Sequence, residues 1–301
     1  MSRTTRKWAM LASTTAIIAI ASIAGAGARA QSASSVAPSG VSQGAVADDA
    51  SKLRVCADPN YLPFSNTAGE GFENKVAALL AKSMGRKLEY TWASYRGQGG
   101  FPNFLADNLQ KHKCDVIMDL PYGDGEEGFT DAYYTSSYVF ISRKDKNYGI
   151  HSMSMPVMRS IKIGYEEGTT PETALKMLNL LPNAVVYHIS EDATASPEQL
   201  LQAVQDNKVG VMVTWKPAIG GFLNKFPDLV VTGVPTEEYG PGIPQVSYTY
   251  KMAIGVRPDD TNLKAALNDA LKANKTQIAS VLADYKVGVD KPPASNNWVN
   301  Q

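Results

Sequence analysis

Short apolar runs alternate with helix-like segments in the first half of the chain. The runs have the length and alternation of strands, whereas the segments between them have the apolar periodicity of an amphipathic helix. The expected strands are 53–57, 87–92 and 115–120, and the expected helices are 71–84 and 104–110. This strand–helix–strand–helix–strand order predicts a parallel sheet with right-handed crossovers.

The same pattern continues on both sides of the polar segment 144–147. It predicts strands at 138–143, 161–164, 184–187, 209–213 and 229–231, and helices at 171–180, 197–205 and 218–224. Residues 251–256 predict a return strand, and residues 262–282 form an amphipathic run that is expected to close the fold. Two α/β units of this kind predict two lobes with a cleft between them. Because ligands of open α/β sheets bind at the carboxyl ends of strands, binding residues are expected in the loops that follow the strands.

The first 30 residues have the three parts of a secretory signal peptide. Basic residues lie between positions 3 and 7, residues 8–26 are apolar, and residues 28–30 form an A-x-A cleavage signal. Cleavage is therefore predicted between Ala30 and Gln31. Ser, Thr and Gly interrupt the apolar part, which favours a cleaved leader over the alternative, a transmembrane anchor. Residues 31–50 are rich in Ser, Ala, Gly and Val and predict a flexible linker.

The formal charge of the whole chain is balanced, with 29 Lys and Arg against 29 Asp and Glu. This balance excludes a nucleic-acid-binding protein of the basic-patch kind. Removal of the leader would take away four basic residues (Arg3, Arg6, Lys7 and Arg29) and no acid, which changes the net charge to −4. No later segment reaches the roughly 18 apolar residues of a membrane span. The exported chain is therefore expected to be soluble.

Common catalytic and metal-binding motifs are missing from the sequence. It has no G-x-S-x-G, no phosphate-binding loop and no Cys/His spacing typical of zinc. Residues 96–100, with the sequence R-G-Q-G-G, predict a flexible loop. The methionines between positions 153 and 158 are interpreted as core or linker residues rather than as ligands of a soft metal. No catalytic residue and no metal site is therefore predicted.

Several motifs resemble those of type II periplasmic solute-binding proteins of the amino-acid-binding kind. They are D-P-N-Y-L-P-F at 58–64, C-D-V-I-M at 114–118 and F-T-D-A-Y-Y at 129–134, and the resemblance covers roughly residues 51–285. More narrowly, six stretches look like the MoxJ/XoxJ family: 53–60, 62–66, 69–75, 89–92, 113–116 and 137–140.

The resemblance implies a fold as well as a function. The implied fold is α/β and two-lobed, of the type II periplasmic-binding-protein kind, with a mixed, mostly parallel sheet in each lobe and a central cleft. The first lobe is expected to contain residues 51–145 and 251–301, and the second lobe residues 146–250.

MoxJ/XoxJ proteins are partners of periplasmic quinoprotein methanol dehydrogenases. The resemblance therefore implies a non-enzymatic periplasmic protein that assists assembly or activation of such a PQQ-dependent enzyme, of the calcium or lanthanide type. PQQ would belong to the dehydrogenase, and this chain is expected to be a monomer that binds no cofactor, nucleic acid or membrane. The alternatives are an ABC-transporter solute-binding protein for a small solute that is not an amino acid, and a lyase of the cyclohexadienyl dehydratase type.

The sequence departs from amino-acid receptors at both of their usual ligand contacts. Such receptors usually carry T-x-x-R, whose Arg guanidinium donates two parallel hydrogen bonds to the ligand carboxylate. The comparable segment here, 121–129, has no Arg and contains three acids. In the second lobe such receptors usually offer an Asp to the ligand ammonium, whereas V-T-W-K-P occupies the comparable positions 213–217. We therefore expect α-amino acids to bind poorly.

The two cysteines are predicted to form a disulfide. In the resembling fold the first and third strands are neighbours, which brings Cys56 close to Cys114. Thiols of an exported protein oxidise, so a bridge is favoured over the alternative of two separate buried thiols.

Candidate cleft residues come from the loops that follow the strands, because aromatic and polar side chains gather there. The Asp and Asn also suit turns, the tryptophans also suit a core, and the threonines also suit a helix cap. The candidate cleft or partner-binding residues are Asp58, Asn60, Tyr61, Phe64, Trp92, Tyr122, Thr169, Thr170 and Trp215.

Overall fold

The computed structural model describes residues 49–97, 99–123, 127–242 and 245–289. The predicted signal peptide, its cleavage site at Ala30–Gln31 and most of the predicted linker lie outside these ranges, as do two of the three acids of segment 121–129. Within the described ranges, no helix is both long enough and apolar enough to cross a membrane.

The first lobe is built on a sheet of four main strands. They lie in the order β4 (Lys87–Trp92), β1 (Lys52–Ala57), β5 (Val116–Pro121) and β12 (Thr249–Val256). β1 pairs parallel with both β4 and β5, whereas β12 runs antiparallel to β5. The predicted parallel strand–helix–strand unit is therefore confirmed. Three short strands complete this part of the fold: β2 (Asn60–Tyr61), β3 (Ser65–Asn66) and β6 (Gly128–Phe129).

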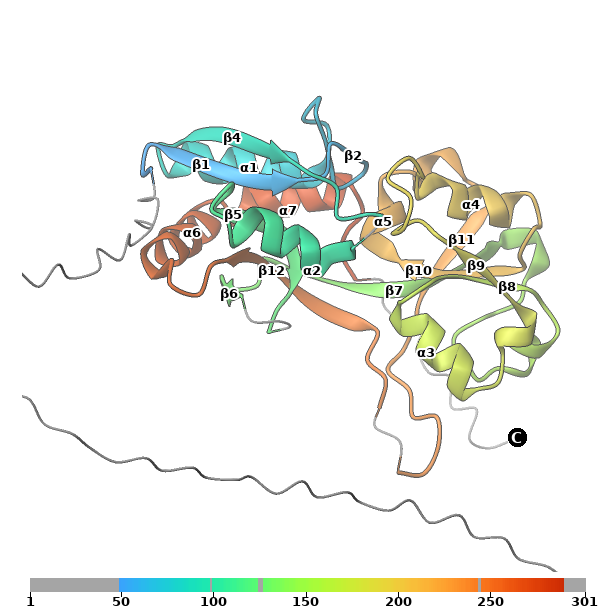
Figure 1. Ribbon diagram of the computed structural model, residues 1–301. Helices are drawn as coiled ribbons and strands as arrows, with labels where there is room; N and C mark the ends of the chain where they lie inside the picture. Colours follow the sequence, from blue (N-terminus) through green and yellow to red (C-terminus); the bar gives the residue numbers. More distant parts are fainter. Residues whose placement is uncertain (1–48, 98, 124–126, 243–244, 290–301) are drawn as a thin grey trace, which may run out of the picture. The chain divides into compact units, whose positions relative to one another are not determined.

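Helices cover both faces of this sheet (Figure 1). Successive residues of a strand point to opposite faces. Val55 packs in the hydrophobic cluster that contains α1 (Phe72–Ser83), whereas its neighbour Cys56 packs with Phe104 of α2 (Gly100–Phe104). A π-helical segment, Leu105–Leu109, continues α2.

The closing amphipathic run of the first lobe is interrupted. The run expected over 262–282 is divided in the structure into two helices, α6 (Thr261–Ala273) and α7 (Lys275–Asp284). The break is at Asn274, whose backbone leaves the helical region (φ −104°, ψ 14°) and whose side-chain amide donates to the carbonyl of Ala270 at 2.8 Å. A short polar side chain that bonds to nearby backbone competes with helix continuation, so Asn274 ends α6.

The second lobe has a mixed sheet of its own. Its strands lie in the order β7 (Tyr134–Arg143), β10 (Val211–Trp215), β8 (Ile163–Glu166) and β9 (Ala184–Tyr187), and β11 (Leu229–Gly233) pairs with the other edge of β7. β8 pairs parallel with both β9 and β10, whereas β7 runs antiparallel to β10. The helices are α3 (Thr170–Met177), α4 (Glu198–Gln205) and α5 (Lys216–Gly220), with short 3-10 turns at Lys144–Lys146, Pro156–Arg159, Leu181–Asn183 and Leu223–Lys225.

β7 takes part in the sheets of both lobes. Its first residues, Tyr134 to Ser137, pair with β12, and its next residues, Tyr138 to Ser142, pair with β10. The two sheets are therefore continuous through one ten-residue strand. The lobe boundaries expected at residues 145 and 250 stay predictions.

The predicted disulfide between Cys56 and Cys114 is confirmed. Cys56 lies in β1, and Cys114 lies two residues before β5, which pairs with β1. The two Cα atoms are 5.5 Å apart, and both cysteines are buried. A bridge across 58 residues of sequence stabilises the fold by about 4 kcal/mol in the chain-entropy description.

Candidate binding cleft

A cavity of about 440 Å³ is lined by residues of both lobes. The first lobe contributes residues that follow β1 and β4 and residues in the second half of β5, and the second lobe contributes residues at the ends of β8 and β10. The cavity therefore lies where the carboxyl ends of these strands meet, as expected for an open α/β sheet.

Two groups of aromatic rings contribute to the cavity wall. On the first lobe, the ring of Tyr61 stacks on Phe64 with centroids 4.8 Å apart and meets Tyr95 edge-on at 5.8 Å. On the second lobe, Trp215 contacts Tyr138 at 5.2 Å and Tyr250 at 5.9 Å. Rings packed against one another have already lost most of their torsional freedom, so they provide rigid contact area for a bound group at little further cost in entropy.

Two carboxyl groups, one from each lobe, also line this cavity: Asp119 in the second half of β5 and Glu166 at the end of β8. Thr214 Oγ1 donates a hydrogen bond to Glu166 Oε1 at 2.5 Å. Burial raises the pKa of the Glu166 carboxyl above its usual value and raises the pKa of Asp119 to about 8.

Asp119 has an unusual backbone conformation. Its φ is +63°, in the left-handed region that non-glycine residues rarely adopt, and its carboxylate accepts a hydrogen bond from the hydroxyl of Tyr134. Glu73 lies beside it, and burial followed by the negative charge of Asp119 raises the pKa of the Glu73 carboxyl. A left-handed Asp in an otherwise apolar strand is the kind of local strain found at functional sites.

Arg96 spans the gap between the lobes. Its guanidinium forms an ion pair with Asp58, with 3.2 Å between Nε and Oδ2, and lies 4.1 Å from the centre of the Tyr61 ring. It also donates to backbone carbonyls of the second lobe: to Asp192 at 3.2 Å, Ala193 at 2.8 Å and Ala195 at 2.7 Å. The flexible loop expected at 96–100 is therefore wrong for Arg96, because a side chain with this many buried partners has a fixed position.

The structure brings five of the nine candidate residues together in the cavity wall: Tyr61, Phe64, Thr169, Thr170 and Trp215. The Thr170 hydroxyl lies 2.7 Å from that of Tyr250, and the Thr169 hydroxyl donates to the carbonyl of Glu166 at 2.6 Å. These two bonds fix the threonines at the start of α3, beside the carboxyl group of Glu166.

The other four candidates lie elsewhere. Asp58 lines a smaller adjacent cavity of about 170 Å³, and Asn60 is exposed and provides a carbonyl to Arg96. Trp92 stacks on Tyr90 at the surface, and Tyr122 is 56% exposed and packs against Phe129. Neither Trp92 nor Tyr122 is among the described lining residues of the 440 Å³ cavity.

Sequence reasoning missed the charged residues of the site, namely Arg96, Asp119 and Glu166. A signal was present for Asp119, because it is a single acid inside the apolar run V-I-M-D-L at 116–120. A lone acid in a buried strand costs free energy unless it is paired or functional.

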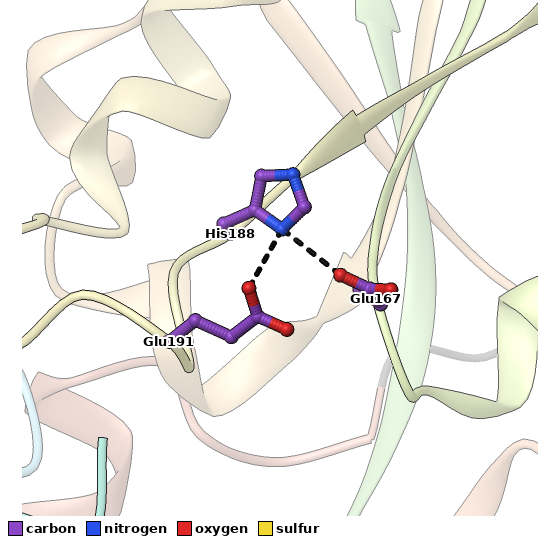
Figure 2. Close-up of side chains that lie close together, drawn as sticks. All are labelled: Glu167, His188 and Glu191. Atoms are coloured by element: carbon purple, nitrogen blue, oxygen red, sulfur yellow. Dashed lines mark ion pairs between the residues drawn. The ribbon is translucent and has the colours of Figure 1, made fainter. Parts of the chain in front are cut away.

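A separate cluster contains Glu167, His188 and Glu191 (Figure 2). Nδ1 of His188 lies 3.0 Å from a carboxylate oxygen of each glutamate. The three side chains are 47%, 52% and 56% exposed, in the order Glu167, His188, Glu191. Their ligand atoms lie within 4.8 Å of one another, so the residue types and spacing suit a divalent cation. Ion pairs this exposed contribute little to stability.

Comparison with known proteins gives consistent matches over most of the chain. The family of bacterial extracellular solute-binding proteins, family 3, matches residues 53–282. Protein MoxJ of Methylorubrum extorquens is 31% identical over 82% of this chain and 84% of its own length. Two solved structures are each 26% identical and match 78% of this chain and 98% of their own: MxaJ from Methlophaga aminisulfidivorans, with a TM-score of 0.68, and the periplasmic binding protein XoxJ from Methylobacterium extorquens, with a TM-score of 0.62.

Proposed function

Because the chain belongs to the MoxJ family within the bacterial extracellular solute-binding proteins of family 3, we propose that it is a periplasmic accessory protein of methanol oxidation. In this proposal it assists the assembly or activation of a quinoprotein methanol dehydrogenase of the calcium or lanthanide type. The observation that carries the proposal is the similarity to MoxJ, which extends over 82% of the chain and therefore includes both lobes.

The proposal assigns binding to this chain and catalysis to its partner. PQQ belongs to the dehydrogenase, and this chain contributes no cofactor and no reaction of its own. Both cysteines are held in the disulfide, so neither offers a free thiolate as a nucleophile.

The aromatic wall of the second lobe is the part of the cleft best suited to a partner segment. Trp215 is only partly buried and contacts both Tyr138 and Tyr250, so its ring is fixed while part of its surface stays open. Residues of this kind dominate binding energy at interfaces, since they offer a large area at little entropic cost. Opening and closing of the lobes would then admit and hold the segment.

Affinity capture from the periplasm of methanol-grown cells tests the proposal. Tagged protein is expected to capture a methanol dehydrogenase, identified by mass spectrometry. Trp215→Ala should weaken capture by roughly tenfold or more, as for an aromatic hot spot. Met177→Ala is the matched control, because Met177 is an exposed apolar residue (44%) outside the described cavity wall and should leave capture unchanged.

The capture experiment also distinguishes the proposed function from the two alternatives. A cavity of 440 Å³ is large enough for a small solute. Capture of an ABC permease in place of the dehydrogenase would therefore favour a transport receptor. Turnover of a prephenate-like acid by the purified protein would favour a lyase. Either result, with no dehydrogenase captured, would overturn the proposed function.

A further inference from the structure

The described wall of the cavity contains acidic groups but no basic side chain that could pair with them. Asp119 and Glu166 are its two carboxyl groups, and its described lining contains no lysine, arginine or histidine. The guanidinium of Arg96 is close to Tyr61, but it is already paired with Asp58 and bonded to backbone carbonyls of both lobes. Neither Asp119 nor Glu166 has an ion pair with a basic side chain among the described residues.

The two carboxyl groups come from different lobes. Asp119 belongs to β5 of the first lobe, and Glu166 belongs to β8 of the second. Burial disfavours the ionised form of both carboxyl groups when the cavity is empty. A cation between them would favour the ionised forms and would then interact with both. Such a ligand would therefore favour the closed arrangement of the lobes.

The aromatic wall makes an organic cation a better ligand than a metal ion. Ammonium and guanidinium groups bind over the faces of Tyr and Trp, whereas hard divalent cations need several oxygen ligands. The wall already shows this type of contact, because the guanidinium of Arg96 lies 4.1 Å from the centre of the Tyr61 ring. Tyr138, Tyr250 and Trp215 provide further rings beside Glu166 in the same cavity.

We propose that the cleft binds an organic cation, an alkylammonium or alkylguanidinium group without a carboxylate, between Asp119 and Glu166 and against the aromatic rings. The described cavity wall has no basic side chain to receive a carboxylate, so a carboxylate bound there would lose its hydration without gaining a charged partner. The cation is either a free amine or the basic side chain of a protein segment, since the two share this chemistry. The inference goes beyond the accessory role and does not depend on it.

Calorimetric titration with agmatine and with L-arginine tests the proposal, because these two probes differ only by the carboxylate. Agmatine is expected to bind with a Kd of about 100 µM or tighter, which is about −5.5 kcal/mol. Arginine should bind at least about tenfold more weakly, because its carboxylate would be desolvated with no basic partner among the described lining residues. Tighter binding of arginine than of agmatine, or no heat from agmatine up to ~1 mM, would overturn the proposal.

Charge-removing variants locate the site. Glu166→Gln should weaken agmatine binding by about tenfold or more, since a charge-assisted contact in a buried site is lost. Glu198→Gln is the matched control, because Glu198 pairs with Lys225 at the surface and should leave the affinity unchanged. Asp119→Asn is a second test in case Glu166→Gln does not fold, as judged by circular dichroism. Equal affinity in the folded cavity variants and the control would place binding elsewhere.

Competition separates the two sources of the cation. If excess agmatine releases captured dehydrogenase, the natural ligand is a basic side chain of the partner; if capture is unaffected, the ligand is a free amine. If no dehydrogenase is captured at all, the proposed accessory function is wrong. The agmatine titration still tests whether the cleft binds an organic cation.

Discussion

Arg96 and Asp58 form an ion pair whose two side chains are almost completely enclosed, with 0% and 1% of their surface exposed. Asp58 directly follows β1 of the first lobe, whereas the carbonyls that accept the other Arg96 hydrogen bonds belong to residues 192–195 of the second. One guanidinium therefore neutralises a buried acid and joins the two lobes.

We expect Arg96→Ala to lower the free energy of unfolding by about 3–5 kcal/mol, because the substitution leaves Asp58 buried without its partner. Denaturant unfolding followed by circular dichroism measures this loss. Arg159→Ala serves as the control, since Arg159 is exposed and its side chain makes only one long hydrogen bond within the described part of the chain, to the carbonyl of Leu178. Its effect should stay within about 0.5 kcal/mol. Equal stability of the two variants would show that the buried pair contributes nothing.

The disulfide gives a second prediction. The intact mass of the exported protein should lie two hydrogens below that of the dithiol, and alkylation without reductant should label neither Cys56 nor Cys114. Cys114→Ser should lower the free energy of unfolding by about 2–4 kcal/mol, because the unfolded chain regains the freedom of a long loop. Labelling of both cysteines in the untreated protein would contradict the bridge.

The buried Asp119 predicts that stability falls as the pH rises. Burial raises its pKa to about 8 in the folded protein, whereas the unfolded chain has the ordinary value near 4. Between these two values the folded state holds a proton that the unfolded state has lost, so the unfolding free energy decreases with rising pH. The shifts of Glu73 and Glu166 have the same direction and add to the slope.

Asp119→Asn removes one of these titrating groups, so its unfolding free energy should depend less steeply on pH between about 4 and 8. Urea unfolding of both proteins at several pH values across this window measures the two slopes. A variant slope equal to or steeper than that of the natural chain would mean that Asp119 is ionised in the folded protein at neutral pH.

The apolar periodicity predicted most of the architecture because strands and helices leave different patterns in the sequence. The strand at 87–92 and the helix at 71–84 were expected within one residue of β4 and α1. The break at Asn274 was not predicted, since the apolar positions of α6 and α7 continue in nearly the same register, and the side-chain bond to Ala270 ends the helix.

The charged part of the site could not be predicted in the same way. The carbonyls that hold Arg96 are about one hundred residues further along the chain, and only the tertiary fold brings residues 192–195 to the glycine-rich loop. Without those partners, an arginine among glycines is typical of a solvated loop. Tyr61 and Trp215 were easier to predict as cleft residues. Each lies at or just after the end of a strand, and aromatic residues at such positions commonly line a cleft.

The passage of β7 through both sheets restricts how the lobes can move. Ser137 pairs with Thr249 in one sheet, and the next residue, Tyr138, pairs with Trp215 in the other. A hinge made of loops allows two lobes to shift and rotate relative to each other in many directions. Hydrogen-bonded strands resist stretching, however, and deform mainly by twisting. We therefore expect the lobes to open mainly by rotation about an axis close to the peptide between Ser137 and Tyr138, so that the cavity walls meet in the same alignment each time the lobes close.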